Sequence, residues 1–206
     1  MSTLASWTVS AILMVGAVLY YCLMWWDSDP GRRLLERFPK KEIMSRNGDR
    51  LYLTRYFLLG GEFSRWALMV HHMHMPDDDA CHHDHPWNFW TLILKGGYVE
   101  EITTSFRAAV AGWARRLPIV AVLTWDTVVV AQHNRPGTFH YRPAEHTHRI
   151  AALPTGDCWT LVWRTKRHRG WGFHTKQGWV HWREFINLRK VFGAVWCGPD
   201  TPKDQV

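Results

Sequence analysis

The sequence predicts an all-β domain, a sandwich or a barrel, behind one apolar helix. Many short runs of β-branched and aromatic residues are separated by Pro, Gly and Asn, a spacing typical of such folds. Only one later stretch, HWREFINLRKVF, has a helical pattern. With 206 residues, 47% of them hydrophobic, the chain is long enough for one sizeable core, so we expect a single folded domain.

The N-terminal residues 1–27 predict a membrane anchor. The stretch WTVSAILMVGAVLYYCLMWW, from Trp7 to Trp26, carries no charge and has about the length that a membrane-spanning helix needs. It lacks the basic start and the cleavage site of a signal peptide, and a core helix would be unusually apolar on all sides. Positive charges follow this run, so we expect a single-pass membrane protein with its C-terminal domain in the cytoplasm.

Residues 28–42 predict a linker helix between the anchor and the barrel. The acidic residues of Asp27–Asp29 can cap it, Pro30 suits an early position, and Pro39 would end it. We expect the β domain to span residues 43–195. The remaining residues, 196–206, are expected to form a flexible tail.

Two hairpins and several further strands are predicted within the β domain. Asn47-Gly48 lies between two apolar runs, which is a strong hairpin signal. Gly96-Gly97 lies between NFWTLIL and YVEEITT and predicts a second hairpin. The other candidate strands are RWALMVHHMHM, TVVVAQH, GTFHYRP, HTHRIAAL and CWTLVWRT.

Charge and cysteine usage limit the partners and the compartment. The net charge is +7 with neutral histidines, but the basic residues are scattered and form no nucleic-acid motif, so no nucleic-acid partner is expected. None of the four cysteines has a C-x-x-C spacing. We therefore expect no disulfide framework and a reducing compartment. Cys81 could form a crosslink or bind a metal, but a small half-buried thiol is the preferred interpretation.

Histidines crowd the stretch HHMHMPDDDACHHDHPW, from His71 to Trp87. On a strand, His83 and His85 would share one face and Asp84 would point the other way. The later stretch HTH offers His146 or His148 with the same alternation, and a ligand from such a distant strand would complete a three-histidine metal site. Imidazoles suit Fe(II), Zn, Mn, Ni or Cu, and three of them leave coordination positions open for substrate.

Less specific roles fit the remaining polar residues of this region. A polar face or support of the ligands is the preferred interpretation for His72 and His74. For Asp77–Asp79, a solvated acidic loop is preferred over a second cation site. His133 and His140 would either line a pocket or be exposed.

The histidine stretch resembles the first motif of the cupin superfamily, G-x5-H-x-H-x(3,4)-E-x6-G. His83 and His85 fill the H-x-H, and Gly97 falls where the last glycine belongs. The glutamate of the motif would fall at Phe89 or Trp90, so this acidic ligand is absent from the pattern.

The second cupin motif, P-x-G-x2-H, is similar to PAEHTH. Pro143 fits, Glu145 replaces the glycine, and His148 takes the ligand position in preference to His146. A three-histidine site without glutamate resembles the branch that contains cysteine dioxygenase. The strings from HDHPW to GWVHW, over roughly residues 45–185, also resemble an uncharacterised group of bacterial and phage cupin-like proteins.

The resemblance implies a double-stranded β-helix, or jelly roll, with a metal bound by His83, His85 and His148. Fe(II) is the metal implied most strongly, and the substrate would be a small thiol or another metal-chelating acid. Many cupins pair through edge strands, so a homodimer is compatible with the resemblance.

Residues beyond the ligands predict how a substrate would be held. A carboxylate would need an arginine, and the strand-borne candidates are Arg55, Arg142 and Arg149. Arg149 follows His148 and should point away from the metal, so Arg142 is the preferred catalytic candidate. Tyr98 is the preferred acid or polar orienting group, with Tyr141 as its rival. The stretch WGFHTKQGWVHWREF is expected to turn into a helix, either as a wall over one end of the barrel or as ordinary packing.

These observations lead to an enzymatic hypothesis: a membrane-anchored cupin-like metalloprotein that uses Fe(II) and dioxygen to oxidise a small molecule. The alternative is a non-catalytic cupin that holds a small ligand or a structural metal at the membrane. An isomerase would need a general base, and the sequence names no strong one.

Overall fold

The computed structural model describes residues 29–105, 121–124, 127–192 and 197. The chain divides into two compact units, residues 1–40 and residues 41–206. The anchor predicted for residues 1–27 lies outside the described residues. Among the residues that are described, no helix has both the length and the apolar character needed to cross a membrane.

The described part of the first unit contains a short helix, α2 (Asp29–Leu35). Pro30 lies in its first turn, where proline needs no hydrogen-bond partner, and Arg32 and Arg33 lie in its last turn, where positive charge favours the helix dipole. The Phe38 N–H closes the end of the helix on the Leu35 carbonyl, 2.9 Å away. The helix predicted within residues 28–42 is therefore present and ends at Leu35.

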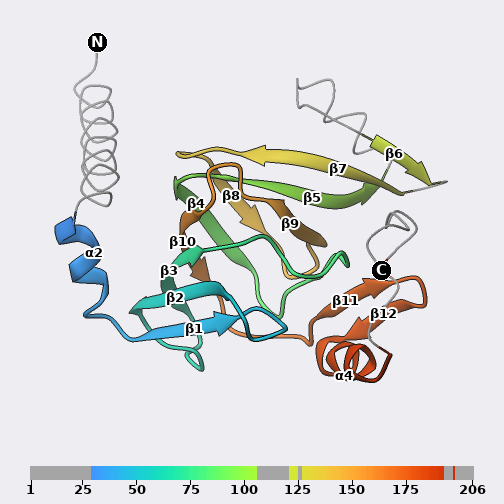
Figure 1. The fold of residues 1–206 in the computed structure, drawn as a ribbon, viewed down its shortest axis with the longest axis horizontal. Helices are drawn as coiled ribbons and strands as arrows, with labels where there is room; N and C mark the ends of the chain where they lie inside the picture. Colours follow the sequence, from blue (N-terminus) through green and yellow to red (C-terminus); the bar gives the residue numbers. More distant parts are fainter. Residues whose placement is uncertain (1–28, 106–120, 125–126, 193–196, 198–206) are drawn as a thin grey trace, which may run out of the picture. The chain divides into compact units, whose positions relative to one another are not determined.

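Two sheets make up most of the second unit (Figure 1). The six-stranded sheet has the order β1 (Lys40–Met44), β2 (Leu51–Leu59), β3 (Ala67–Met73), β10 (Cys158–Arg164), β4 (Phe89–Lys95) and β8 (Phe139–Arg142). The four-stranded sheet has the order β6 (Ala121–Thr124), β7 (Thr127–Asn134), β5 (Tyr98–Ser105) and β9 (His148–Ala152). An isolated antiparallel bridge adds His83 beside His148 of β9.

The strand order is that of a jelly roll. Strand β10 lies between β3 and β4 and is antiparallel to both, and β5 lies between β7 and β9 in the same way. The chain therefore crosses repeatedly between the sheets and returns beside strands made much earlier, which is the interleaved pattern that jelly rolls, including cupins, share. The predicted all-β jelly roll is confirmed as an architecture.

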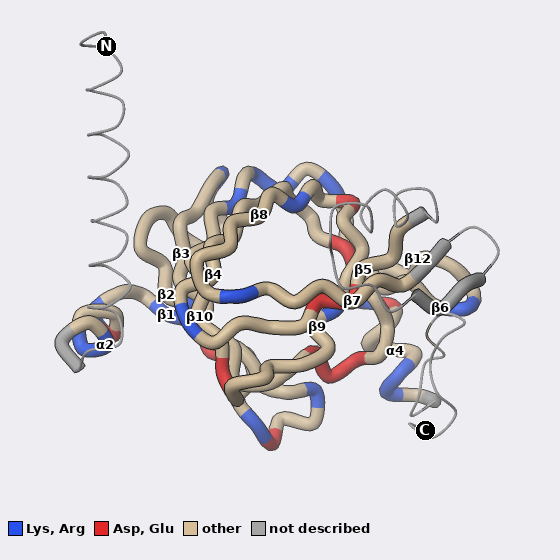
Figure 2. The backbone as a smooth tube through the Cα atoms, turned by 90° about the horizontal axis from the view of Figure 1, so that it is seen from above, with Lys and Arg blue, Asp and Glu red and all other residues tan. Residues whose placement is uncertain are grey.

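The hydrophobic core lies between the two sheets. One cluster of buried residues joins β2, β3, β4 and β10 of the larger sheet to β5 and β9 of the smaller one; it consists of Leu53, Met73, Ile93, Tyr98, Ile150 and Cys158. Seen from above (Figure 2), β2, β3, β4 and β10 lie on one side and β5, β7 and β9 on the other. Alternate residues of these strands face the space between the sheets, where the site described below is built.

The hairpin predicted across Gly96-Gly97 is not formed. Strand β4 pairs with β10 and β8, whereas β5 pairs with β7 and β9. The two glycines have φ values of 79° and 109° and carry the chain from one sheet to the other. A Cβ at Gly97 would meet the Asn134 carbonyl oxygen at 2.5 Å, so the crossing requires glycine at that position. The Asn47-Gly48 turn, in contrast, joins the neighbouring strands β1 and β2 as predicted.

The C-terminal part adds a hairpin and a helix. Strands β11 (Gly172–Thr175) and β12 (Gly178–His181) pair with each other and lead into α4 (Trp182–Phe192). The predicted helix is confirmed, but the aromatic stretch before it forms a hairpin instead of a simple turn. A second small core joins these elements to the segment before His83, and its buried members are Cys81, Phe173, Phe185 and Cys197.

Cys81 and Cys197 form a disulfide across a separation of 116 residues. The prediction that the chain would contain no disulfide, with Cys81 as a half-buried thiol, is therefore wrong. The two cysteines have no motif spacing because the fold, not the local sequence, brings them together. Cys158 is free and buried in the barrel core, and Cys22 lies outside the described residues.

Candidate metal centre

His83 and His85 lie on an extended segment that is not part of a regular strand. The backbone N–H of His83 donates to the His148 carbonyl at 2.8 Å, and His148 returns a hydrogen bond of 3.0 Å to the His83 carbonyl. The backbone N–H of His85 donates to the Ala144 carbonyl at 2.9 Å. This pairing places the segment beside β9 and explains why the alternation expected of a strand still holds.

Asp84 points to the opposite side of this segment, as predicted, and anchors it to the C-terminal hairpin. Its carboxylate accepts hydrogen bonds from the Gly172 backbone N–H at 2.7 Å and from the Trp179 indole at 3.0 Å. Arg169 forms an ion pair with it at 2.9 Å, and Asp84 is only 2% exposed. A buried carboxylate with three partners is well compensated, so Asp84 holds the histidine segment from behind.

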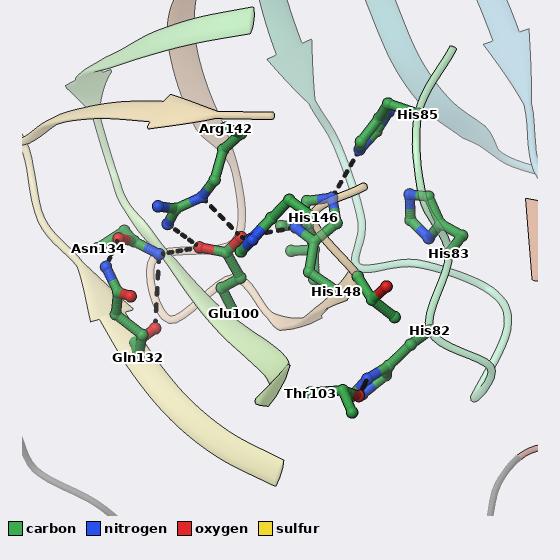
Figure 3. A network of polar contacts seen from close by, with 12 residues as sticks. His82, His83, His85, Glu100, Thr103, Gln132, Asn134, Arg142, His146 and His148 are labelled. Atoms are coloured by element: carbon green, nitrogen blue, oxygen red, sulfur yellow. Dashed lines mark hydrogen bonds and ion pairs between the residues drawn. The ribbon is translucent and has the colours of Figure 1, made fainter. Parts of the chain in front are cut away.

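The structure brings His83, His85 and His148 together (Figure 3). One ligand atom from each lies within 4.8 Å of the other two. The Nε2 atoms of His85 and His148 are 2.8 Å apart. Two imidazole nitrogens bound at right angles to one ion, each about 2.1 Å from it, would be separated by about 3 Å. The observed spacing therefore fits two ligands of a single metal ion.

Glu100, on β5, orients His148. Its Oε1 atom lies 2.6 Å from His148 Nδ1 and 2.9 Å from His146 Nε2. A carboxylate on Nδ1 keeps the proton on that nitrogen and leaves Nε2 with a free lone pair, which is the arrangement that metal-binding histidines use. Glu100 is thus the partner that turns His148 into a ligand presented to the interior.

The Glu100 carboxylate is fully buried, with 0% of the residue exposed, and is held from its other side. Arg142 donates to it at 2.6 and 3.3 Å, and the Asn134 amide donates at 3.1 Å (Figure 3). Burial alone would raise the pKa of Glu100, but the hydrogen bonds from His146 and His148 and the charge of Arg142 hold it well below its usual value. Glu100 therefore stays ionised and compensated.

Burial keeps the other two histidines neutral. Loss of solvent lowers the pKa of His83 to about 4, although the nearby Asp77 acts to raise it. Loss of solvent, with the neighbouring His148 and His83, also lowers the pKa of His85 well below its usual value. Neutral imidazoles are the form that binds metal, so the site is prepared for an ion near neutral pH.

His146 lies at the same site as its rival His148. A second group of potential ligands consists of Glu100, His146 and His148, which shares His148 with the first group. In this structure the ring of His146 is bound to Glu100 through Nε2 and lies 5.0 Å from the ring of His148. His148 alone reaches both Glu100 and His85, so it is the residue that links the two groups.

The predicted substrate-binding residues have different surroundings. Arg142 is engaged by Glu100, as described above. Tyr98 is 6% exposed within the barrel core, and burial, with the charge of Glu100, raises its pKa well above the usual value, so its hydroxyl stays protonated. Arg149 faces away from Glu100 and pairs with Glu101, with its Nε atom 2.5 Å from the Glu101 carboxylate. Arg55 has no such carboxylate on its Nε atom.

The acidic loop before the histidines is more buried than a solvated loop would be. Asp79 is 6% exposed and pairs with Arg46 and Arg189. Asp77 accepts a hydrogen bond of 2.7 Å from the Ile150 backbone N–H and lies 3.8 Å from His83 Nδ1. The prediction of a solvated loop is therefore wrong for Asp79, and Asp77 lies beside a proposed ligand.

A pocket of about 170 Å³ opens beside His83. Its acidic wall comes from the loop Asp77–Asp79 and its aromatic wall includes Trp171 and Phe173. His72 and His74 contribute to neither the pocket nor the metal group; His72 contacts Asp157 at 2.8 Å, and His74 contacts the Thr54 hydroxyl at 3.1 Å. The pocket is small for a drug-sized ligand, so it would admit only a small molecule.

Comparisons with known proteins give distant structural likenesses. No family model and no curated protein matches the chain. A cupin 2 conserved barrel domain protein from Rhodopseudomonas palustris is 11% identical, with a TM-score of 0.44 over 75% of this chain and 85% of that one. A cupin-2 domain from Rhodospirillum rubrum is 12% identical, with a TM-score of 0.43 over 74% and 82%.

The iron(II) form of HppE is also similar, at 13% identity and a TM-score of 0.41. That match covers 63% of this chain and 57% of the HppE chain, so the chain spans little more than half of that protein. At these values the jelly-roll assignment rests on the strand order, and the metal site rests on the three histidines.

Proposed function

We propose that this chain is a cupin-like metalloprotein that binds one first-row divalent metal ion through His83, His85 and His148. The observation that carries the proposal is the convergence of their ring nitrogens, with His85 and His148 at 2.8 Å and Glu100 on the far nitrogen of His148. Isolated surface histidines have no reason to converge and be oriented in this way.

The donor set fits the ions expected from the sequence. Three neutral imidazoles suit Fe(II), Zn, Mn, Ni or Cu, and three protein ligands leave positions for a small chelating substrate. Fe(II) bound there would supply the oxidation chemistry of a non-haem oxygenase or dioxygenase, which is the activity we propose. Selectivity among these ions comes from geometry and supply, so metal analysis must precede activity screens.

The chain itself would hold and orient the ligands. Glu100 retains the Nδ1 proton of His148, and Asp84 fixes the backbone between His83 and His85. Phe89 packs edge-on against His85, with ring centroids 4.8 Å apart, and adds an apolar wall. A small substrate would then meet oriented ligands beside an aromatic wall.

Metal analysis tests the proposal. The full-length chain, without a histidine tag, is reconstituted without oxygen with Fe(II), and bound metal is measured by elemental analysis. We expect about one equivalent in the wild type and a loss of at least tenfold in affinity for His83→Ala and His148→Ala. His168→Ala, at an exposed histidine, is the matched control and should bind like the wild type. Absence of metal from the reconstituted wild type would contradict the proposal.

The alternative is a non-catalytic metal or ligand carrier. It is favoured by the second group, Glu100, His146 and His148, which could hold a structural ion on the other nitrogen of His148. Oxygen uptake in the presence of small acids and thiols, together with exchangeable water at the bound ion, would support the enzyme. A saturated ion without exchangeable water would support the carrier.

Membrane attachment through residues 1–27 belongs to the same proposal and is supported by the uncharged run from Trp7 to Trp26. Retention of the chain in membranes after an alkaline carbonate wash is the expected result, and release into the soluble fraction would contradict it.

A further inference from the structure

The inner face of the six-stranded sheet carries polar residues where the core is otherwise apolar. Arg55 on β2 and His71 on β3 are direct partners in the register of these strands. Since alternate residues of a strand share a face, both point to the same side as the core residues next to them. Those residues belong to two apolar clusters, with Leu53 and Met73 in one and Phe57 and Met69 in the other.

Three nitrogens in this part of the barrel have no hydrogen-bond partner. Among the described residues, the buried side-chain atoms without a partner are Arg55 Nε, His71 Nε2 and His140 Nε2. His140 lies on β8 two residues before Arg142, and so on the face that Arg142 uses to reach Glu100. Buried polar groups in folded proteins almost always have partners. Three unpaired nitrogens on one inner face are therefore available to form hydrogen bonds with a bound molecule.

The charge of Arg55 indicates the sign of the charge that a bound molecule would carry. Of the three arginines predicted as carboxylate partners, Arg142 is neutralised by Glu100 and Arg149 by Glu101. Arg55 lies near Glu62, but Glu62 is paired with Lys41. Burial, followed by the charge of Arg55, lowers the pKa of His71 well below its usual value, so a neutral imidazole lies beside a guanidinium. A buried positive charge is costly unless an anion compensates it.

Arg55, His71 and His140 face the same interior as the metal ligands. His85 packs against Phe89, which lies on β4 directly opposite Arg142 of β8, and His140 precedes Arg142 by two residues on the same face. Arg55, His71, His85 and His140 all keep some exposure to solvent although they lie on the inside. Each of them therefore borders space that solvent can reach.

We propose that Arg55 and His71 bind the carboxylate of a small acid whose second donor atom reaches the His83–His85–His148 centre. This inference rests on the proposed function and specifies its substrate class: a monocarboxylic acid with a hydroxyl, amine or thiol next to the carboxylate. Arginine binds carboxylates through two parallel hydrogen bonds, which fixes orientation as well as charge. The Nε2 atom of His71 supplies an additional partner from the neighbouring strand.

Binding of lactate and of lactamide, its neutral amide, tests the inference. The full-length chain is loaded with Fe(II) without oxygen, and each ligand is titrated by calorimetry into the wild type, Arg55→Gln and Arg149→Gln. Arg149→Gln is the matched control, because it removes an arginine of the same barrel that is already paired with Glu101. We expect lactate to bind about tenfold or more weakly to Arg55→Gln, with bound metal and lactamide binding unchanged. Arg149→Gln should bind lactate like the wild type.

A parallel titration separates this inference from the metal proposal. Lactate is added to the metal-free wild type and Arg55→Gln, and the histidine ring signals are followed by NMR. Weaker lactate binding to metal-free Arg55→Gln than to the metal-free wild type supports the anion site, even if the wild type fails to take up metal. If Arg55→Gln does not fold, Arg55→Lys takes its place. It keeps the charge without the paired hydrogen bonds and should bind lactate more weakly than the wild type does. Equal lactate affinity in wild type and Arg55→Gln, or equal affinity of wild type for lactate and lactamide, would overturn the inference.

Discussion

The two halves of the metal site are held in different ways. His148 lies on β9, a regular strand whose partner across the sheet is β5, and β5 also supplies Glu100. His83 and His85 lie on a segment with only isolated backbone bridges. That segment is held by Asp84 and by the disulfide of Cys81, both of which contact the C-terminal part of the chain.

The difference shows which interactions each half depends on. The register of β5 and β9 places a carboxylate and a histidine side by side through local backbone pairing. The segment around Asp84 depends instead on side chains from residues about a hundred positions away in the sequence. Changes to the β9 half, which carries His148, should therefore lower metal affinity and barrel stability together. Changes to the segment half, which carries His83 and His85, should first alter the geometry of these two ligands.

The largest effect is expected from Glu100→Gln, which breaks the β9 half. Loss of the charge leaves the buried Arg142 without its ion pair and removes the carboxylate that orients His148. Breaking a buried pair on one side costs about 3–5 kcal/mol, and loss of such a supporting carboxylate lowers metal affinity about 10–100-fold. Urea unfolding and metal titration measure the two effects. Unchanged metal affinity would show that Glu100 does not orient His148.

Removal of the disulfide is the next largest change and breaks the segment half. The double variant Cys81→Ala/Cys197→Ala opens a covalent link across 116 residues, and loss of such a link costs about 2–4 kcal/mol. Because the barrel sheets are untouched, we expect a lower midpoint of thermal unfolding together with weaker but still measurable metal binding. Cys158→Ala, at the free cysteine, is the control for loss of a sulfur atom. A variant that unfolds like the wild type would contradict a role for the disulfide in holding the segment.

The sequence predicted the convergence of the three histidines because strand alternation is a local rule. His83, His85 and His148 each follow from an H-x-H spacing and from the resemblance to known motifs. The same rule correctly placed Asp84 on the side opposite the ligands and Arg149 on the side opposite Glu100.

Glu100 could not be found in this way. It is adjacent to Glu101, so alternation requires one of the two to face inward without saying which. The expected hairpin between β4 and β5 also assigned β5 to the wrong neighbours; its real partners, β7 and β9, bring His148 to it. The disulfide was missed for the same physical reason, since contacts across 116 residues depend on topology and leave no local spacing.

Asp84→Asn is expected to have a smaller effect on the same segment. The amide can still accept from the Gly172 N–H, but it carries no charge for Arg169 and presents a donor toward the Trp179 indole. Loss of these buried interactions should cost about 1–3 kcal/mol. We expect metal affinity to fall by a larger factor than the loss of barrel stability alone would cause. The Cys81→Ala/Cys197→Ala variant should show the same pattern. Loss of stability with unchanged metal affinity would separate Asp84 from the ligands.

The smallest effect is expected from Glu101→Gln, the matched control for Glu100→Gln on the opposite face of β5. Hydrogen bonding from His82, followed by Arg149, lowers the pKa of Glu101 to about 2 from an ordinary value of 4.5, against the effect of burial. A lowered pKa stabilises the folded state above pH 4.5, and this contribution is lost as the pH falls through 2. Because the pair with Arg149 is partly exposed, the variant should lose only about 1 kcal/mol or less at pH 7. Its unfolding curve should converge on that of the wild type near pH 2, and its metal affinity should be unchanged. If Glu101→Gln lost metal as Glu100→Gln should, the two faces of β5 would not be distinct, and the orientation of His148 would need another cause.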